Sequence, residues 1–106
     1  MRIDQYNKLV RDHTPEIVRH QGGIPKTKIL NDDKYFAALN EKLREEVAEY
    51  LEAYDTEELA DIMEVILAIA AHKGLSARQL EEIRQKKQQE RGGFLGRIFL
   101  AEVERP

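Results

Sequence analysis

The sequence predicts an all-α protein, a bundle of about four helices built around an antiparallel helical hairpin. Two stretches carry this prediction. Residues 33–54 repeat apolar side chains at three- and four-residue spacing, and residues 57–71 contain neither Pro nor Gly. Residues typical of helix ends separate the segments. A chain of 106 residues without an internal repeat is expected to form one domain, residues 1–106.

The N-terminal third predicts one short helix and one extended segment. Thr14 is expected to cap the helix with Pro15 at its first position, and the helix is expected to run to about Gln21, before two glycines. Residues 24–30 alternate like an edge strand. Ile98–Leu100, in the tail of residues 94–103, are compatible with a short strand that pairs with Lys28–Leu30.

The second helix is predicted from about Asp33 to Tyr54, with Asn31 and Asp32 as caps. Its apolar residues recur along one face, as in a helix that packs against a partner. That face consists of Phe36, Leu39, Leu43, Val47, Tyr50, Leu51 and Tyr54.

The third helix follows a very short junction, so helices two and three are expected to pack as an antiparallel hairpin. Asp55 and Glu58 resemble a capping box, and the helix is expected to end near Lys73, before Gly74. Between Leu59 and Ala71 only two residues are charged, which predicts a helix buried on all sides. So small a chain has little surface to cover it, and we therefore expect a homodimer or homotetramer.

A fourth helix is predicted to start with a capping box at Ser76 and Gln79 and to run to about Arg91. Its core face holds little more than Leu80 and Ile83. Its last turns are strongly polar and basic, and Lys86, Lys87 and Arg91 are candidate phosphate contacts. Lys8 and Arg11 are further candidates. Because charged runs are usually solvated surface, the alternative is that these residues bind nothing.

Composition excludes several classes of protein. The net charge is −3 with both signs mixed along the chain, which argues against binding nucleic acid or membrane surfaces. The chain has no cysteine, which excludes disulfides and thiolate metal sites and suits the cytoplasm. The first residues lack the apolar core of a signal peptide, and no apolar run is long enough to span a bilayer. We expect a soluble, cytoplasmic protein.

Four carboxylates are the main candidates for function. Glu46 and Glu49 border the apolar face of the second helix, while Glu58 and Asp61 lie one turn apart on the third. An antiparallel hairpin brings the two pairs together. Carboxylates held this close repel each other unless a cation joins them, and oxygen-only ligands favour Mg²⁺, with Mn²⁺ as the alternative. The opposing interpretation is that Glu46 and Glu49 are solvated and Glu58 only caps its helix.

Three stretches, taken in order, resemble a known family. They are the N-terminal Tyr6–Asp12 with Pro15-Glu16, the acidic pattern Glu45-Glu46-x-x-Glu49 with Glu58-x-x-Asp61, and Glu90–Phe94. Together they resemble the all-α nucleoside triphosphate pyrophosphatases of the MazG-like superfamily, in the branch described as phosphoribosyl-ATP pyrophosphohydrolase-like.

The resemblance implies hydrolysis of a nucleoside triphosphate between its α and β phosphates, giving the monophosphate and pyrophosphate. It implies that Glu46, Glu49, Glu58 and Asp61 bind Mg²⁺ and that Glu45 is an outer ligand or orients water. Either Glu45 or Glu49 would accept the proton of the attacking water. Many members are dimers or tetramers. Two alternatives remain: a phosphoribosyl-ATP pyrophosphatase of histidine biosynthesis, and a helical oligomerisation or partner-binding module without enzymatic activity.

Overall fold

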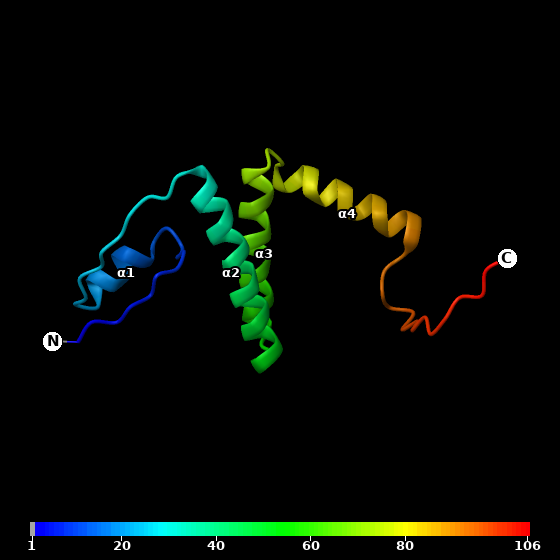
Figure 1. The fold of residues 1–106 in the computed structure, drawn as a ribbon, viewed down its shortest axis with the longest axis horizontal. Coiled ribbons are helices and arrows are strands. Elements are labelled where there is room, and N and C mark those ends of the chain that lie inside the picture. Colours follow the sequence, from blue (N-terminus) through cyan, green and yellow to red (C-terminus); the bar gives the residue numbers. More distant parts are fainter. Residues whose placement is uncertain (1) are drawn as a thin grey trace.

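The computed structural model describes residues 2–106, and within this range it contains four helices and no strand (Figure 1). The short α1 (Thr14–His20) lies on the N-terminal side of a pair of long helices, and the last helix projects from the other side. The remaining helices are α2 (Asp32–Ala53), α3 (Thr56–His72) and α4 (Ala77–Arg91). The all-α prediction is confirmed.

Helices α2 and α3 form the predicted antiparallel hairpin (Figure 1). The chain reverses at Tyr54, whose φ of 58° lies in the left-handed region and whose N–H still bonds the carbonyl of Tyr50 at 2.7 Å. Leu39 of α2 (2% exposed) and Val65 of α3 are buried between the helices. The spacing of apolar residues along α2 therefore identified only part of the face that packs on α3, because Val47, Leu51 and Tyr54 of the predicted face are exposed.

The helix ends agree only in part with the sequence predictions. Asn31 caps α2 by accepting from the N–H of Lys34, and Ser76 and Gln79 form the predicted capping box of α4. The capping box predicted at Asp55 is wrong, because its side chain makes no capping hydrogen bond. Thr14 is also not the N-cap of α1; the helix already includes it, and His13 occupies the cap position.

The prediction that α3 is buried on all sides is wrong for the single chain. Leu59 and Ile66 are exposed, and Met63 is 63% exposed. Only α2 packs along α3, and one neighbouring helix covers only one side of a cylinder. The apolar residues on the remaining sides of α3 are therefore surface that the chain does not cover by itself.

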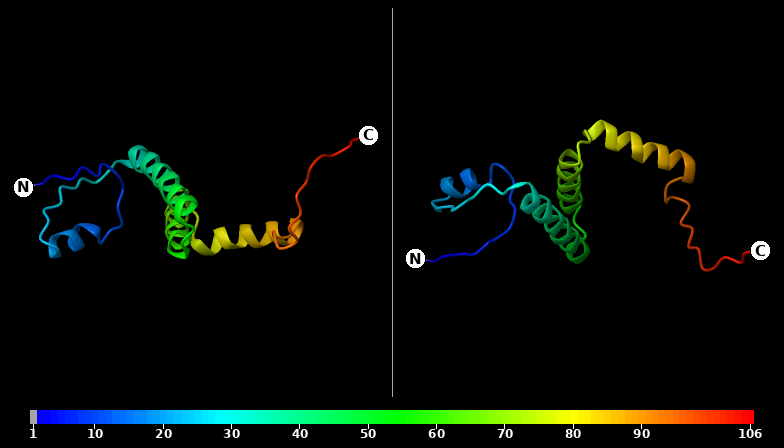
Figure 2. Two further views of the ribbon diagram at one scale, coloured as in Figure 1. Left: turned by 90° about the horizontal axis from the view of Figure 1, so that it is seen from below. Right: turned by 45° about the horizontal axis from the view of Figure 1, so that its top comes forward.

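The C-terminal arm, defined here as α4 with residues 92–106, leaves the hairpin instead of folding back on it (Figure 2). The molecule is consequently elongated, with extents of 67 × 32 × 24 Å. The predicted pairing of Lys28–Leu30 with Ile98–Leu100 is wrong, since these segments are not strands and lie on opposite sides of the hairpin (Figure 1). Among the described residues, no helix is long and apolar enough to cross a membrane.

Candidate metal and phosphate site

Three carboxylates from the two hairpin helices meet at one point. Glu46 of α2 and Glu58 and Asp61 of α3 each offer an oxygen, and these oxygens all lie within 4.8 Å of one another. The tight turn at Tyr54 produces this meeting, because it places the last turns of α2 beside the first turns of α3. We refer to these three residues as the carboxylate cluster.

Two oxygens of the carboxylate cluster are buried without a protein donor. Glu46 is 7% exposed, and its Oε2 has no hydrogen-bond partner; the Oε2 of Glu58 is likewise buried and unpartnered. Leaving a buried polar group unpaired costs about 1–3 kcal/mol, and more when the group is charged. Such atoms therefore call for a partner outside the described side chains.

The electrostatics of the cluster also indicate that a partner is missing. Burial raises the pKa of Glu46, and the carboxylates of Glu49 and Asp61 raise it further, against the opposing effect of Lys42. Loss of solvation also raises the pKa of Glu58, with Glu49, Asp61 and Glu46 adding repulsion. A positive charge placed among these groups would relieve this repulsion.

The N-terminal segment brings two basic residues to the cluster from far away in the sequence. The Nζ of Lys8 bonds the Oε1 of Glu45 at 2.7 Å, and the Nη2 of Arg11 bonds the Oδ1 of Asp61 at 2.7 Å. These contacts span 37 and 50 residues. Lys8 and Arg11, predicted as phosphate contacts, therefore lie beside the acids of the hairpin.

Lys8 and Glu45 stabilise each other's charged forms. Their hydrogen bond holds the pKa of Glu45 below its ordinary value and raises the pKa of Lys8. A cavity of about 140 Å³ lies beside this pair, lined mostly by residues 7–9 and by α2. Glu45 is thus ionised and fixed at the edge of the carboxylate cluster.

Lys42 is the residue that sequence reasoning did not single out. Its Nζ lies 3.3 Å from both Glu45 and Glu46, bridging them on the surface of α2. The signal was present, because Lys42 precedes these residues by three and four positions, the spacing of neighbours on a helix. Lys42 supplies the one cation directly in contact with Glu46 among the described residues.

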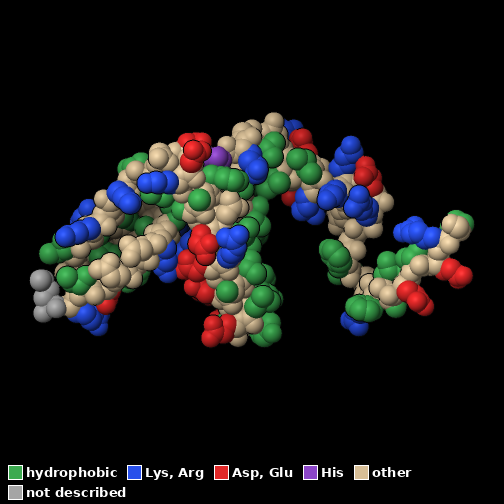
Figure 3. Space-filling model, in the orientation of Figure 1, with side chains coloured by type: hydrophobic (Ala, Val, Ile, Leu, Met, Phe, Trp, Pro, Cys, Tyr) green, Lys and Arg blue, Asp and Glu red, His purple; other side chains and the backbone are tan. Residues whose placement is uncertain are grey.

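The other predicted site residues fall into two groups. Glu49 lies outside the set of three closest oxygens but near enough to raise the pKa of Glu46 and Glu58 by repulsion. The α4 residues are not brought to the cluster within the chain. Lys86, Lys87 and Arg91 are exposed on a helix that projects away from the hairpin (Figure 3).

His72 shares a helical face with the acids but lies at the other end of α3. Its contacts there hold the two helices together. Its ring stacks on Phe36 at 5.0 Å between centroids, and its Nε2 lies 3.0 Å from the Oδ1 of Asp32. These contacts join the end of α3 to the start of α2. Glu64, also on α3, is exposed.

The donor set of the carboxylate cluster fits Mg²⁺. Oxygens on an octahedral Mg²⁺ lie about 3.0 Å apart when adjacent and about 4.2 Å apart when opposite, since each bond is about 2.1 Å. The cluster oxygens, all within 4.8 Å of one another, would draw together by at most about 1.8 Å to reach these spacings. The residues that would bind the ion are Glu46, Glu58 and Asp61, with Glu49 adjacent.

Comparisons with known proteins assign no family to the chain. No family model matches the chain, and no solved structure matches it. The chain is similar to an uncharacterized protein of Mycolicibacterium smegmatis, with 53% identity over 53 residues. That match covers 50% of this chain and 53% of the relative, so the chain spans about half the length of the relative.

Proposed function

We propose that this chain is a Mg²⁺-dependent nucleotide pyrophosphohydrolase that cleaves a nucleoside triphosphate between its α and β phosphates. The observation that carries the proposal is the carboxylate cluster, in which two buried carboxylate oxygens lack a donor. Basic side chains beside it supply the second requirement for holding a polyphosphate. A cytoplasmic location suits this activity, because nucleoside triphosphates are made and used there.

In the proposed reaction, water attacks the α-phosphorus, and the bond from that phosphorus to the bridging oxygen breaks, which releases pyrophosphate. A bound Mg²⁺ would lower the pKa of water and neutralise charge on the phosphates. Glu45 or Glu49 accepts the proton of the attacking water. The hydrogen bond from Lys8 positions Glu45 beside the carboxylate cluster, but it also lowers the pKa of Glu45 and so weakens this carboxylate as a base.

Lys8 and Arg11 have a second role in this proposal. Both side chains form ion pairs at 2.7 Å with carboxylates of the site, and in this proposal they bind phosphate oxygens when the substrate enters. Arg11 suits this role, since its planar guanidinium can bind phosphate through two parallel hydrogen bonds. The N-terminal segment would then position the substrate over the hairpin.

The test is pyrophosphate release from a panel of ribo- and deoxyribonucleoside triphosphates and phosphoribosyl-ATP, with Mg²⁺ or with EDTA. We expect turnover of at least one compound that requires Mg²⁺ and falls by at least about 100-fold in Glu46→Gln and Asp61→Asn. Glu64→Gln is the matched control, because Glu64 is exposed on the same helix as Asp61. Unchanged turnover in a folded Asp61→Asn protein would overturn the site.

Preference for phosphoribosyl-ATP in this panel would instead favour the histidine-biosynthesis alternative. Calorimetry separates the non-enzymatic alternative: a partner-binding module with surface acids should bind neither Mg²⁺ nor a nonhydrolysable triphosphate analogue. Binding of both that is lost in Glu46→Gln supports the proposed site.

A further inference from the structure

Much of the apolar surface of this chain has no partner within the chain. One such surface is the hairpin apolar face, defined as Val47, Leu51, Leu59, Met63 and Ile66, all exposed. A second lies in the C-terminal arm, where Phe94, Leu95, Ile98 and Phe99 are each more than 90% exposed. Figure 3 shows hydrophobic side chains along the side of the hairpin that faces the arm, while acidic ones gather on the opposite side.

The exposed area is too large for a chain that works alone. The chain exposes 10116 Å², whereas a compact monomer of 12.3 kDa exposes about 6,100 Å². Its radius of gyration is 18.7 Å, against about 13 Å for a compact domain of this length. The excess of about 4,000 Å² exceeds the roughly 800 Å² per partner of a standard interface several-fold.

Folding α4 back onto its own hairpin does not cover this surface. Beyond Ile83, α4 contains no apolar residue as far as Arg91. A folded-back α4 would therefore lay charged and amide side chains over Leu59 and Met63, which leaves them poorly packed. A second copy of the hairpin apolar face is a better cover, because an interface of this kind is self-complementary about a two-fold axis.

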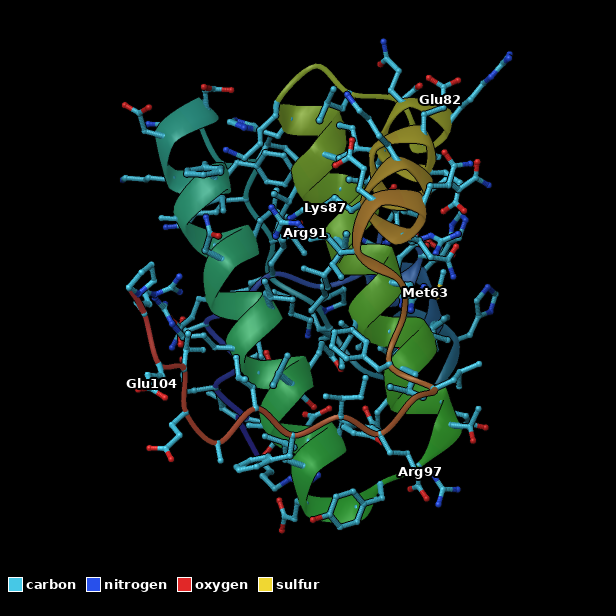
Figure 4. All side chains as sticks on the ribbon, turned by 90° about the vertical axis from the view of Figure 1, so that its right-hand side faces the viewer. Met63, Glu82, Lys87, Arg91, Arg97 and Glu104 are labelled. Carbon is cyan, nitrogen blue, oxygen red and sulfur yellow. The ribbon has the colours of Figure 1, made fainter. Side chains whose placement is uncertain are left out.

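The charges of the arm and the hairpin are complementary. The last turns of α4, which leaves its own hairpin, carry Lys86, Lys87 and Arg91, all exposed, while the hairpin carries the carboxylate cluster. Figure 4 shows Lys87 and Arg91 on the same side of α4. As a helix of 15 residues, α4 is about 22 Å long. This is enough to cross two helices packed about 8–10 Å apart.

We propose that two copies of this chain pair through their hairpin apolar faces, and that the C-terminal arm of each copy completes the phosphate site of the other. The apolar residues of the arm pack on the partner, and Lys86, Lys87 and Arg91 lie beside the partner's carboxylate cluster, where they bind the triphosphate. The binding of a triphosphate by the arm rests on the proposed pyrophosphohydrolase function. The pairing of two chains does not depend on that function.

The pairing is tested by light scattering on the full chain. The wild-type protein is expected at twice the chain mass, and Met63→Lys is expected to weaken association at least 100-fold. Ala37→Lys places the same charge on an exposed position near the start of α2, about 15 Å along that helix from Val47, and should leave the dimer intact. A monomeric wild-type protein, or equal effects of the two variants, would overturn the proposal.

The exchange of arms is tested by mixing two inactive variants and allowing the chains to reassociate. Glu46→Gln removes an acid, and Lys87→Glu with Arg91→Glu reverses the arm. Half of the dimers then contain one chain of each variant. If the arm acts on the partner, one of the two sites in such a dimer has both an intact cluster and an intact arm. Mg²⁺-dependent pyrophosphate release from mixed deoxyribonucleoside triphosphates should recover to about a quarter of wild type. No recovery would mean that each arm serves its own chain.

A cross-linking experiment separates this inference from the proposed function. The chain has no native cysteine, so a short thiol cross-linker acts only on the double variant Glu45→Cys with Arg91→Cys. Links between two chains support exchanged arms even if no triphosphate is hydrolysed, in which case the proposed function fails alone. Links within one chain refute the exchange even if the enzyme is active.

Discussion

The hairpin and the C-terminal arm contain similar kinds of apolar residues and use them in opposite ways. In the hairpin, Leu39 is 2% exposed because α3 returns beside α2 after a turn at Tyr54. In the arm, Leu95 is 98% exposed because no second surface lies within reach. Apolar side chains order a chain only where the chain also supplies an opposing surface. The exposed apolar residues of the arm therefore indicate that an assembly must provide the opposing surface.

The largest effect on stability should distinguish the two regions directly. Leu39→Ala removes a buried side chain and is expected to lower the free energy of unfolding by about 2–5 kcal/mol. Leu95→Ala should have an effect that depends on protein concentration, because it acts through association. Urea unfolding of both variants at two protein concentrations tests this. Concentration-independent effects of equal size would remove the distinction between hairpin and arm.

Metal binding should stabilise the hairpin through the carboxylate cluster. At 100 times its dissociation constant, Mg²⁺ is expected to raise the free energy of unfolding by about 2.7 kcal/mol. Asp61→Asn should lose most of this gain, and the exposed Glu64→Gln should retain it. Thermal scans with Mg²⁺ and with EDTA measure the difference. Equal stabilisation of both variants would place the metal elsewhere.

The start of the arm should depend on its capping box. Ser76→Ala removes the hydrogen bond that the Oγ of Ser76 accepts from the N–H of Gln79, and it is expected to cost about 1 kcal/mol of stability. Asp55→Ala is the matched comparison at the start of α3, where the side chain makes no such bond, and should cost less. Chemical unfolding of the two variants gives the comparison, and a larger loss for Asp55→Ala would contradict it.

The smallest expected effect is the pH dependence of the metal-free protein. The pKa of Glu46 is raised by burial above its ordinary value of 4.5. A raised carboxyl pKa favours the folded state below 4.5, and this contribution is lost as the pH rises through the folded-state pKa. The stability of Glu46→Gln relative to wild type should therefore increase from about pH 4.5 upward. Thermal scans in EDTA would contradict this if the difference stayed constant or fell.

Local patterns predicted the elements of this fold well. The capping residues Asn31 and Ser76 act through side chains only three positions from their partners, so the sequence contains both members of each bond. The spacing of apolar residues in α2 and the two-residue connection at Tyr54 and Asp55 are likewise local features, and together they favour a hairpin. The four-residue connection before α4 is also short, yet α4 leaves the hairpin (Figure 2), so a short connection alone does not decide the packing. The meeting of Glu46 with Glu58 and Asp61 follows from helical spacing together with that turn.

Contacts between distant segments could not be predicted in this way. The ion pairs of Lys8 with Glu45 and Arg11 with Asp61 depend on the path of an irregular N-terminal segment, which no periodic pattern specifies. The expected strand pairing failed for a related reason. Residues 28–30 and 98–100 have suitable side chains, but the hairpin separates them, and pairing depends on proximity that composition does not encode.

By itself, the sequence determined the four helices, the hairpin and the set of acids on its edge, because each depends on residues within a few turns of one another. Only the tertiary structure decided that two carboxylate oxygens are buried without donors, that Lys8 and Arg11 lie beside the acids, and that the apolar surface of α3 stays open. These features depend on which distant surfaces meet. The run of α3 that its composition predicted to be buried has one covered side within this chain, and its exposed side is where we expect a second copy to bind.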